Sequence, residues 1–377
     1  MILLWVAGLG AAAQFAKIGV PFALVRDIYP DAGFLISWLL TLVSVSGALL
    51  GMVAGRLVTQ IGLGPALMIG LVLGGLASAF QTLVPGLNWM LLSRLIEGLS
   101  HLMIVVAAPT LIAQICSDRY RGVGMTLWST FFGVGFTVVA WGGLPLAEAY
   151  SVPFLWAVHA GLMFATALGV WASWRHLPQV DRGGRLLGLR PILQDHRLTY
   201  GSPFIGAPAL GWLFYALNFV ALVTVLPELL PVDQRAIIAG AMPLVSIVVS
   251  LVVVSALLVR FSSISVIIMG FIASGCVLMT ALLDLPLPWV CIALFAALGL
   301  VQGASFAAVP ELNKRPEDQA LAYGAMAQTG NIGNLLGTPI LMAVLTNVGQ
   351  DAMFLVVAGF YLAGVAIHVR LRQARLA

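Results

Sequence analysis

Long apolar runs dominate this sequence and restrict it to one kind of fold. Each run is about 20 residues long, which is the length that a helix needs to cross the hydrocarbon core of a bilayer. The 377 residues are 61% hydrophobic and only 8% charged, whereas a soluble domain averages about 25% charged residues. The sequence therefore predicts an all-α, multi-pass membrane protein, and its scattered basic residues do not form a nucleic-acid-binding patch.

Glycines, prolines and charges divide the apolar runs into twelve candidate transmembrane helices. The expected spans are 2–25, 33–55, 65–85, 89–115, 125–146, 153–174, 203–227, 236–259, 264–283, 288–310, 320–345 and 352–370. Most connections between them are short, and the long exception is rich in arginine. We therefore predict an N-terminal six-helix half at 1–174, a cytoplasmic central loop at 175–202 and a C-terminal six-helix half at 203–377.

Basic residues are concentrated in alternate loops, whereas the opposite loops hold only Arg26 and Arg235 among several acidic residues. Arginine and lysine accumulate on the cytoplasmic side of membrane proteins. This asymmetry predicts that both termini are cytoplasmic. The first apolar run begins at Met1 without a basic region before it, so we expect a retained first span rather than a cleaved signal peptide.

The two predicted halves resemble each other at an offset of about 200 residues, as expected for the tandem repeats of secondary transporters. The segment from Arg94 to Ser100 matches the segment from Gly299 to Ser305. Arg56 after span 2 likewise matches Arg260 after span 8. Several weak matches in the same order support a duplicated unit of six spans, with a site expected between the halves.

Span 4 carries three ionisable residues, Arg94, Glu97 and His101, inside an apolar run. Their spacing places them on one helix face. Lys17 lies about two-thirds along the expected span 1. Ionisable groups are costly in hydrocarbon, so they are expected to face partners or a polar cavity. They therefore indicate either structural ion pairs or a buried functional site.

The excess of positive charge favours a small organic anion as the ligand of such a site. We predict that Lys17 and Arg94 bind the anion, since a guanidinium suits a carboxylate. Glu97, and His101 as a second candidate, are predicted to carry a proton. The matched positions in the second half are uncharged. The remaining polar candidates for substrate binding are Gln14, Tyr215, Asn218 and Gln302.

His159 and Met163 in span 6 are four residues apart and so share a helix face. This pair leaves copper or metallophore uptake open as an alternative, although methionine is also common in apolar packing. The three cysteines are far apart and predict neither a disulfide nor a zinc site. We find no catalytic or phosphate-binding motif, and therefore expect no enzymatic activity and no cofactor.

Twelve spans in a repeat of six resemble the major facilitator superfamily over essentially the whole chain. The segments from Gly51 to Gly62, from Arg94 to Gly98 and from Arg121 to Met125 are similar to its motifs in loop 2–3, span 4 and the start of span 5. Thr59-Gln60 replaces the usual Asp-Arg pair, which implies a different cytoplasmic gate, and Arg56, Arg121 and Arg260 are the candidate gating residues. The overall pattern is similar to the small bacterial cyanate-transporter-like group, which implies a bacterial inner membrane.

This resemblance implies secondary active transport by alternating access, with spans 1, 4, 7 and 10 lining the cavity. The expected partners are a small-molecule substrate, a proton and the lipid bilayer, and we expect a monomer. Two alternatives remain open beside copper uptake. One is efflux of drugs or metabolites, although span 5 lacks the Gly-Pro pair typical of drug antiporters. The other is a transporter-like sensor or scaffold without flux.

Overall fold

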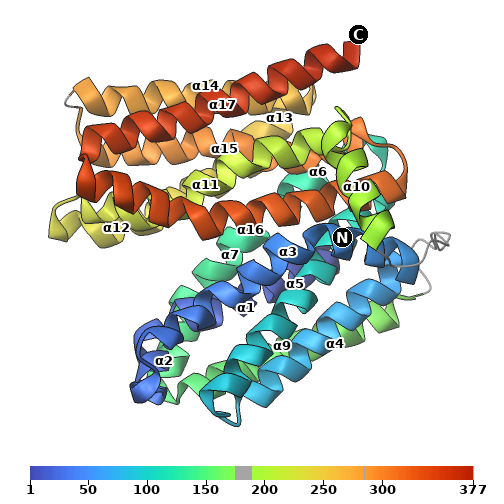
Figure 1. The fold of residues 1–377 in the computed structure, drawn as a ribbon, viewed down its shortest axis with the longest axis vertical. Helices are drawn as coiled ribbons and strands as arrows, with labels where there is room; N and C mark the ends of the chain where they lie inside the picture. The colour runs from blue at the N-terminus through green and yellow to red at the C-terminus, as the bar shows by residue number, and fades with distance from the viewer. Residues whose placement is uncertain (175–188, 284, 377) are drawn as a thin grey trace. The chain divides into compact units, whose positions relative to one another are not determined.

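The structure is a computed structural model that describes residues 1–174, 189–283 and 285–376. Every regular element in these ranges is a helix, and each of the twelve expected spans is helical (Figure 1). The chain divides into two compact units. Unit 1 comprises Met1–Ser117 and Phe131–Leu193, and unit 2 comprises Asp118–Thr130 and Gln194–Ala377.

Unit 1 is built from the helices of the first six spans, except for the start of span 5. These elements are α1 (Ile2–Gly19), α2 (Phe22–Ile28), η1 (Pro30–Ser37), α3 (Trp38–Ile61), α4 (Leu63–Gln81), α5 (Leu87–Ile115), α7 (Phe131–Val138), η2 (Val139–Gly143), α8 (Leu144–Ala149) and α9 (Val152–Ala172). The π-helical turn η2 ends two residues before Pro145, whose missing N–H prevents regular α-helical bonding there.

Unit 2 contains the start of span 5 together with the last six spans. Its elements are α6 (Asp118–Ser129), α11 (Gly206–Glu228), α12 (Val232–Val248), η4 (Val249–Val254), α13 (Ser255–Leu257), α14 (Ser263–Thr280), η5 (Ala281–Leu283), α15 (Leu287–Leu312), α16 (Pro316–Asn347) and α17 (Gln350–Leu376). Helix α6 belongs here because its hydroxyl groups bond to this unit: the Ser129 and Ser250 oxygens are 2.9 Å apart.

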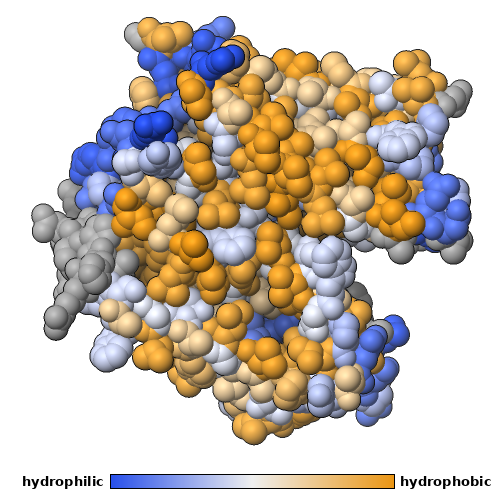
Figure 2. All heavy atoms as spheres, turned by 180° about the vertical axis from the view of Figure 1, so that it is seen from behind, coloured by the Kyte–Doolittle hydropathy of each residue, from blue (hydrophilic) through white to orange (hydrophobic). Residues whose placement is uncertain are grey.

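The described helices have the length and composition of membrane spans. Ten of them are long and apolar enough to cross a bilayer by themselves. The spans at α3 and α16 complete the twelve, although the apolar part of α3 is shorter and α16 carries several buried amides. Hydrophobic side chains cover much of the surface in Figure 2, and exposed leucines and tryptophans account for many of them. Such a surface suits lipid rather than water.

Span 1 is not the continuous helix that the sequence predicted. Helix α1 ends at Gly19, and a new helix, α2, starts after Pro21. Proline has no backbone N–H to donate and its ring clashes with the preceding turn, so it ends regular α-helical bonding at this point. Lys17 therefore lies in the last turn of α1 and not two-thirds along an unbroken span.

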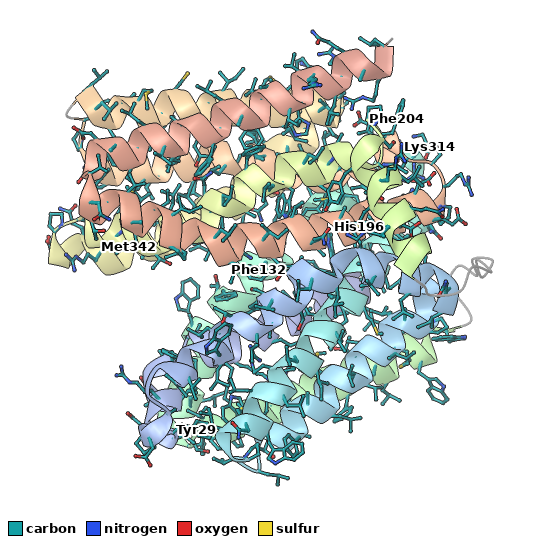
Figure 3. All side chains as sticks on the ribbon, in the orientation of Figure 1. Tyr29, Phe132, His196, Phe204, Lys314 and Met342 are labelled. Atoms are coloured by element: carbon teal, nitrogen blue, oxygen red, sulfur yellow. The ribbon has the colours of Figure 1, made fainter. Side chains whose placement is uncertain are left out.

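The expected central loop contains a helix, α10 (Leu189–Gly201). The Tyr200 hydroxyl donates a hydrogen bond of 2.6 Å to Gln328 Oε1 of α16, and burial raises the pKa of Tyr200 to about 12. Asn313 donates to the Phe204 carbonyl, and Phe204 lies close to Lys314 in Figure 3. These contacts fasten the C-terminal part of the connection to unit 2.

Close helix packing in unit 1 depends on glycine. A Cβ atom added to Gly98 of α5 would lie 2.6 Å from Ser46 Oγ and 3.2 Å from the Val43 carbonyl oxygen, both of α3. Because a backbone carbonyl cannot move aside like a flexible side chain, this position requires glycine. The contact keeps the residues of α5 that lie around Gly98 close to α3.

We predict that Gly98→Ala destabilises the protein by about 1–3 kcal/mol, because the added methyl group overpacks the contact between α3 and α5. Gly161→Ala is the matched control, since nothing lies within 4 Å of a Cβ atom there. The control should gain up to about 1 kcal/mol from better helix propensity. Thermal unfolding of both variants in detergent measures the difference, and equal stabilities would contradict the packing argument.

Candidate functional site

A cluster of buried charges lies at the centre of unit 1. Lys17 comes from α1, and Arg94 and Glu97 come from α5, and all three side chains are fully buried. Glu97 forms ion pairs with both cations, through Oε1 to Lys17 and through Oε2 to Arg94. The pairing of Arg94 with Glu97 follows from their spacing of three residues on one helix. Two cations share one carboxylate, so the three side chains carry one excess positive charge.

Helix α4 supplies the neutral part of the cluster. Gln81 accepts a hydrogen bond of 2.6 Å from Lys17 and donates one of 2.8 Å to Glu97 Oε2. Ser78 accepts from Lys17 and lies 3.2 Å from Glu97 Oε1. All three ammonium hydrogens of Lys17 are therefore used, as burial of a cation requires. The sequence patterns revealed neither residue, although Ser78 and Gln81 are three residues apart and so share a helix face.

Arg94 is not fully bonded within the cluster. Its Nε donates a hydrogen bond of 2.9 Å to the Leu39 carbonyl, and Nη1 bonds to Glu97. The other terminal nitrogen, Nη2, is buried and has no hydrogen-bond partner. A buried donor without a partner is costly, so Nη2 is available to a ligand oxygen.

His159 of α9 joins the same cluster. Its Nε2 lies 2.9 Å from the Gly10 carbonyl oxygen, and its Nδ1 lies 2.7 Å from Ser78 Oγ. The Met163 side chain packs into the space left by two glycines, with its Sδ 2.6 Å from a Cβ atom placed on Gly10 and its Cε 2.6 Å from one placed on Gly74. Both ring nitrogens of His159 are thus engaged, and we assign no metal to His159 and Met163.

The other predicted residues of span 1 and span 4 lie apart from the ion pairs. Gln14 donates a hydrogen bond of 2.7 Å to Ser100 Oγ, while its Oε1 is buried without a partner. His101 Nδ1 lies 3.2 Å from the Ala11 carbonyl oxygen, and its ring packs edge-on against Phe15. His101 thus makes its contacts with α1, whereas the bonds of Glu97 are to Lys17, Ser78, Gln81 and Arg94.

In unit 2 the structure brings two of the predicted residues together. The hydroxyl groups of Tyr215 and Ser246 both donate to Gln302 Oε1, at 3.2 and 2.9 Å. Gln302 Nε2 donates to the Ser129 carbonyl at 2.7 Å. Asn218 stands apart: it donates to the carbonyl of Phe214, and its Oδ1 is buried without a partner.

The candidate gating arginines have different surroundings. Arg121 forms an ion pair of 2.6 Å with Asp118 at the start of α6. Arg260 follows α13 and is exposed. The side chain of Arg56 lies outside the described residues. A gating role for the three arginines stays a prediction.

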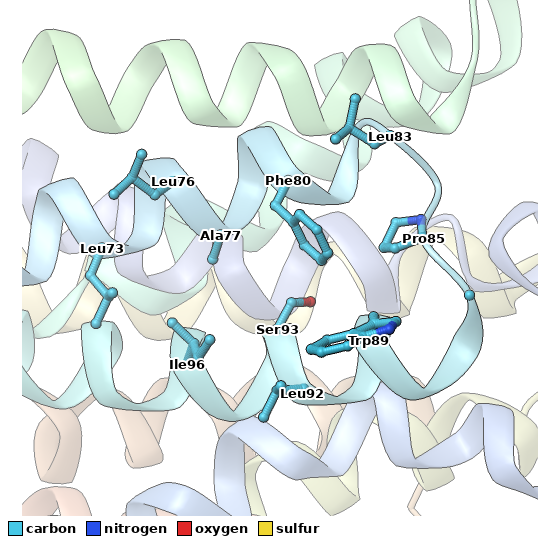
Figure 4. Close-up of a pocket in the computed structure, with 11 residues that line it drawn as sticks. Leu73, Leu76, Ala77, Phe80, Leu83, Pro85, Trp89, Leu92, Ser93 and Ile96 are labelled. Carbon is cyan, nitrogen blue, oxygen red and sulfur yellow. The ribbon is translucent and has the colours of Figure 1, made fainter.

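An apolar groove with a volume of about 680 Å³ lies between α4 and α5 of unit 1. It is lined by Leu73, Leu76, Ala77, Phe80, Leu83, Pro85, Gly86, Trp89, Leu92, Ser93 and Ile96. Figure 4 shows Ser93 as the hydroxyl-bearing residue between these apolar side chains. Its Oγ accepts a hydrogen bond from Gln81. An apolar groove does not suit an anion, so we place no substrate there.

A multi-pass helical protein with opposite charges buried inside its helices has the construction of a secondary transporter. The family model of the Major Facilitator Superfamily matches residues 3–310. The chain therefore belongs to the major facilitator superfamily. The members of this family are membrane transporters of small molecules rather than enzymes.

Relatives and solved structures agree with this family. The chain is 24% identical over 265 residues to the niacin transporter NiaP of Acinetobacter baylyi, a match that covers 60% of this chain and 59% of that protein. Its fold is similar to the human organic anion transporter MFSD10, with a TM-score of 0.77, 15% identity and coverage of 97% and 98% of the two chains. FucP in the outward conformation gives a TM-score of 0.75, with 13% identity and coverage of 98% and 97%.

The ion cluster makes a prediction about stability. Glu97→Gln leaves two buried cations without their carboxylate, so we expect a loss of about 3–5 kcal/mol in the free energy of unfolding. Lys17→Met in the same chain removes one of those cations. The double variant should therefore be more stable than the sum of the single effects predicts, by about 0.5–3 kcal/mol.

Unfolding of the four proteins of this double-mutant cycle in detergent measures the coupling. Lys314→Met supplies the matched control, because Lys314 is the other lysine of the chain and is exposed. Its effect should simply add to that of Glu97→Gln. Additive effects of Lys17→Met and Glu97→Gln would contradict the ion pair.

Proposed function

We propose that this protein transports a small organic anion together with a proton. The observation that carries this proposal is the Glu97 carboxylate held by two buried cations. Lys17 and Arg94 are held in a geometry that binds one carboxylate, and a substrate carboxylate has the same chemistry. A cationic substrate would meet an excess of like charge at this place.

Competition between Glu97 and the substrate provides the coupling. While Glu97 is ionised, Lys17 and one nitrogen of Arg94 are occupied. Protonation removes the negative charge of Glu97 and weakens both ion pairs, so the two cations become available to an anion. Nη2 of Arg94, which has no partner, offers a further hydrogen bond to it. Binding one proton and one monovalent anion leaves the charge of the cluster unchanged, which avoids an added charge in a medium of low dielectric constant.

The relative that transports niacin supports a carboxylate as the substrate. Niacin is a pyridine carboxylic acid and is present as the nicotinate anion near neutral pH. We therefore choose nicotinate as the first probe. Cyanate, acetate and benzoate complete a panel of small anions that differ in size and shape.

Four polar residues outside the ion cluster are also candidates for substrate binding. Gln14 in unit 1 has a free buried acceptor, and so has Asn218 in unit 2. We propose that both, with Tyr215 and Gln302, contact substrate groups.

His101 is the second candidate for proton coupling. The distribution of arginines supports cytoplasmic termini, and we propose a bacterial inner membrane and a monomer.

Uptake of the four radiolabelled anions into proteoliposomes tests the proposal. We expect at least one anion to accumulate when the outside is acidic, and to stop accumulating when a protonophore collapses the pH gradient. Lys17→Met and Arg94→Leu should each reduce this uptake by at least about tenfold, which corresponds to the loss of about 1.4 kcal/mol of binding free energy. Lys314→Met should transport like the unaltered protein, because Lys314 is exposed.

Three results would count against the proposal. Unchanged uptake in the Lys17→Met/Arg94→Leu double variant would exclude the anion site. Uptake that ignores the pH gradient would exclude proton coupling. Export of chemically varied cations, with no movement of the four anions, would favour drug or metabolite efflux instead.

A further inference from the structure

His159 is a titratable side chain that the proposed anion site does not use, yet it is bonded into that site. It is only 4% exposed. The Gly10 carbonyl beside Nε2 can only accept a hydrogen bond, so Nε2 carries the hydrogen. In the neutral ring, Nδ1 then has a free lone pair, and it lies 2.7 Å from the Ser78 hydroxyl. Neutral His159 is therefore an acceptor for Ser78.

The Ser78 hydroxyl lies between His159 and Glu97. Its oxygen is 2.7 Å from Nδ1 of His159 and 3.2 Å from Oε1 of Glu97, and it also accepts from Lys17. A hydroxyl group has a single hydrogen and two lone pairs. It can therefore donate to His159 or to Glu97, but not to both at once. The shorter distance favours donation to His159 while the imidazole is neutral.

We propose that His159 exchanges the transported proton with Glu97 through the Ser78 hydroxyl. This inference rests on the proposed function, because it supplies the proton that releases Lys17 and Arg94. When the imidazole is protonated, the Nδ1–H bond breaks and its proton bonds to Ser78 Oγ. The original hydroxyl hydrogen of Ser78 passes to Glu97 Oε1. His159 becomes neutral, Glu97 becomes a carboxylic acid, Ser78 keeps one hydrogen, and the total charge does not change.

The charges around His159 suit a group that holds a proton only briefly. Lys17 from α1 and Arg94 from α5 oppose a positive imidazole, whereas Glu97 from α5 favours it. Helix α4 contributes no charged side chain. Helix α8 contributes one, Glu148, and this side chain is exposed. An anion bound by Lys17 and Arg94 would offset their charge. Substrate binding and protonation at His159 would thus support each other.

The position of the ring is held from two sides. Nε2 is bonded to the Gly10 carbonyl of α1, and Trp156, one turn earlier on α9, donates to the Lys17 carbonyl at 3.4 Å. These bonds keep α9 in register with the helix that carries Lys17. His101 has a similar bond to an α1 carbonyl, but the bonds of its ring do not include Ser78 or Glu97. The geometry therefore favours His159 over His101 as the partner of Glu97.

Two transport assays on the full-length protein in proteoliposomes separate a proton relay from a structural role. The probe is radiolabelled nicotinate. The first assay measures accumulation driven by a pH gradient, which needs net proton movement. The second measures exchange of nicotinate at equal pH on both sides, which needs none. Proton relays by positioned side chains contribute about 100-fold or more to rates. We expect His159→Gln to lower accumulation at least about tenfold and to change exchange less than about twofold.

Variants of Ser78 and of α9 complete the test. Ser78→Ala removes the relay hydroxyl and also an acceptor for Lys17, so accumulation should fall at least as far as in His159→Gln. Ser78→Thr should restore accumulation because it keeps a hydroxyl group. Thr166→Val is the matched control: Thr166 is buried on α9, and its hydroxyl bonds only within that helix, to the Leu162 carbonyl. Both activities should stay unchanged in that variant.

The outcomes distinguish the relay from the proposed function. Full accumulation in His159→Gln would overturn the relay and leave proton-coupled anion transport standing. A parallel loss of accumulation and exchange would assign His159 a structural role and also overturn the relay. If the unaltered protein exchanges nicotinate but never accumulates it, or moves none of the four anions, the proposed function fails and the relay fails with it.

Discussion

The burial of one carboxylate between two cations is the interaction on which the site in unit 1 depends. In a medium of low dielectric constant, an isolated charge costs several kcal/mol, so none of the three groups could remain there alone. Glu97 offsets this cost by accepting hydrogen bonds from both cations and from Gln81, and the Ser78 hydroxyl oxygen lies 3.2 Å from its Oε1. Three helices must therefore keep their rotational positions for the cluster to survive. A proton that neutralises Glu97 weakens both ion pairs. The cluster is therefore a suitable centre for coupling proton movement to anion binding.

In unit 2, the position of the repeat that corresponds to Glu97 carries an uncharged side chain. Gln302 occupies the place in the repeat that Glu97 occupies in span 4. It is bonded to Tyr215, Ser246 and the Ser129 carbonyl. An amide offers both donors and an acceptor, so neutral groups can bond to both of its ends and no cation is needed. At this position of the repeat the ionisable residue is therefore in unit 1, while the corresponding residue of unit 2 makes a neutral contact.

Much of the fold could be predicted from the sequence because hydrophobicity alone determines a membrane helix. All twelve spans are helical where they were expected, and the ion pair of Arg94 and Glu97 follows from their spacing on one helix. The break after Gly19 was missed, although Pro21 was a visible signal. The partners Ser78, Gln81 and His159 could not be foreseen. The identity of the polar side chain that contacts a charge depends on how α4 and α9 are rotated against α1 and α5. No local pattern in a single sequence encodes that rotation.

The presence of only two lysines in the chain, Lys17 and Lys314, allows a direct measurement on the cluster. In protein labelled with ¹⁵N-lysine and reconstituted in nanodiscs, one ammonium signal reports the buried ion pair and the other reports an exposed side chain. We predict that nicotinate added at acidic pH shifts the Lys17 signal, because Lys17 exchanges Glu97 for the substrate carboxylate. The Lys314 signal should stay in place. A Lys17 signal that stays unchanged at nicotinate concentrations that support transport would contradict the prediction.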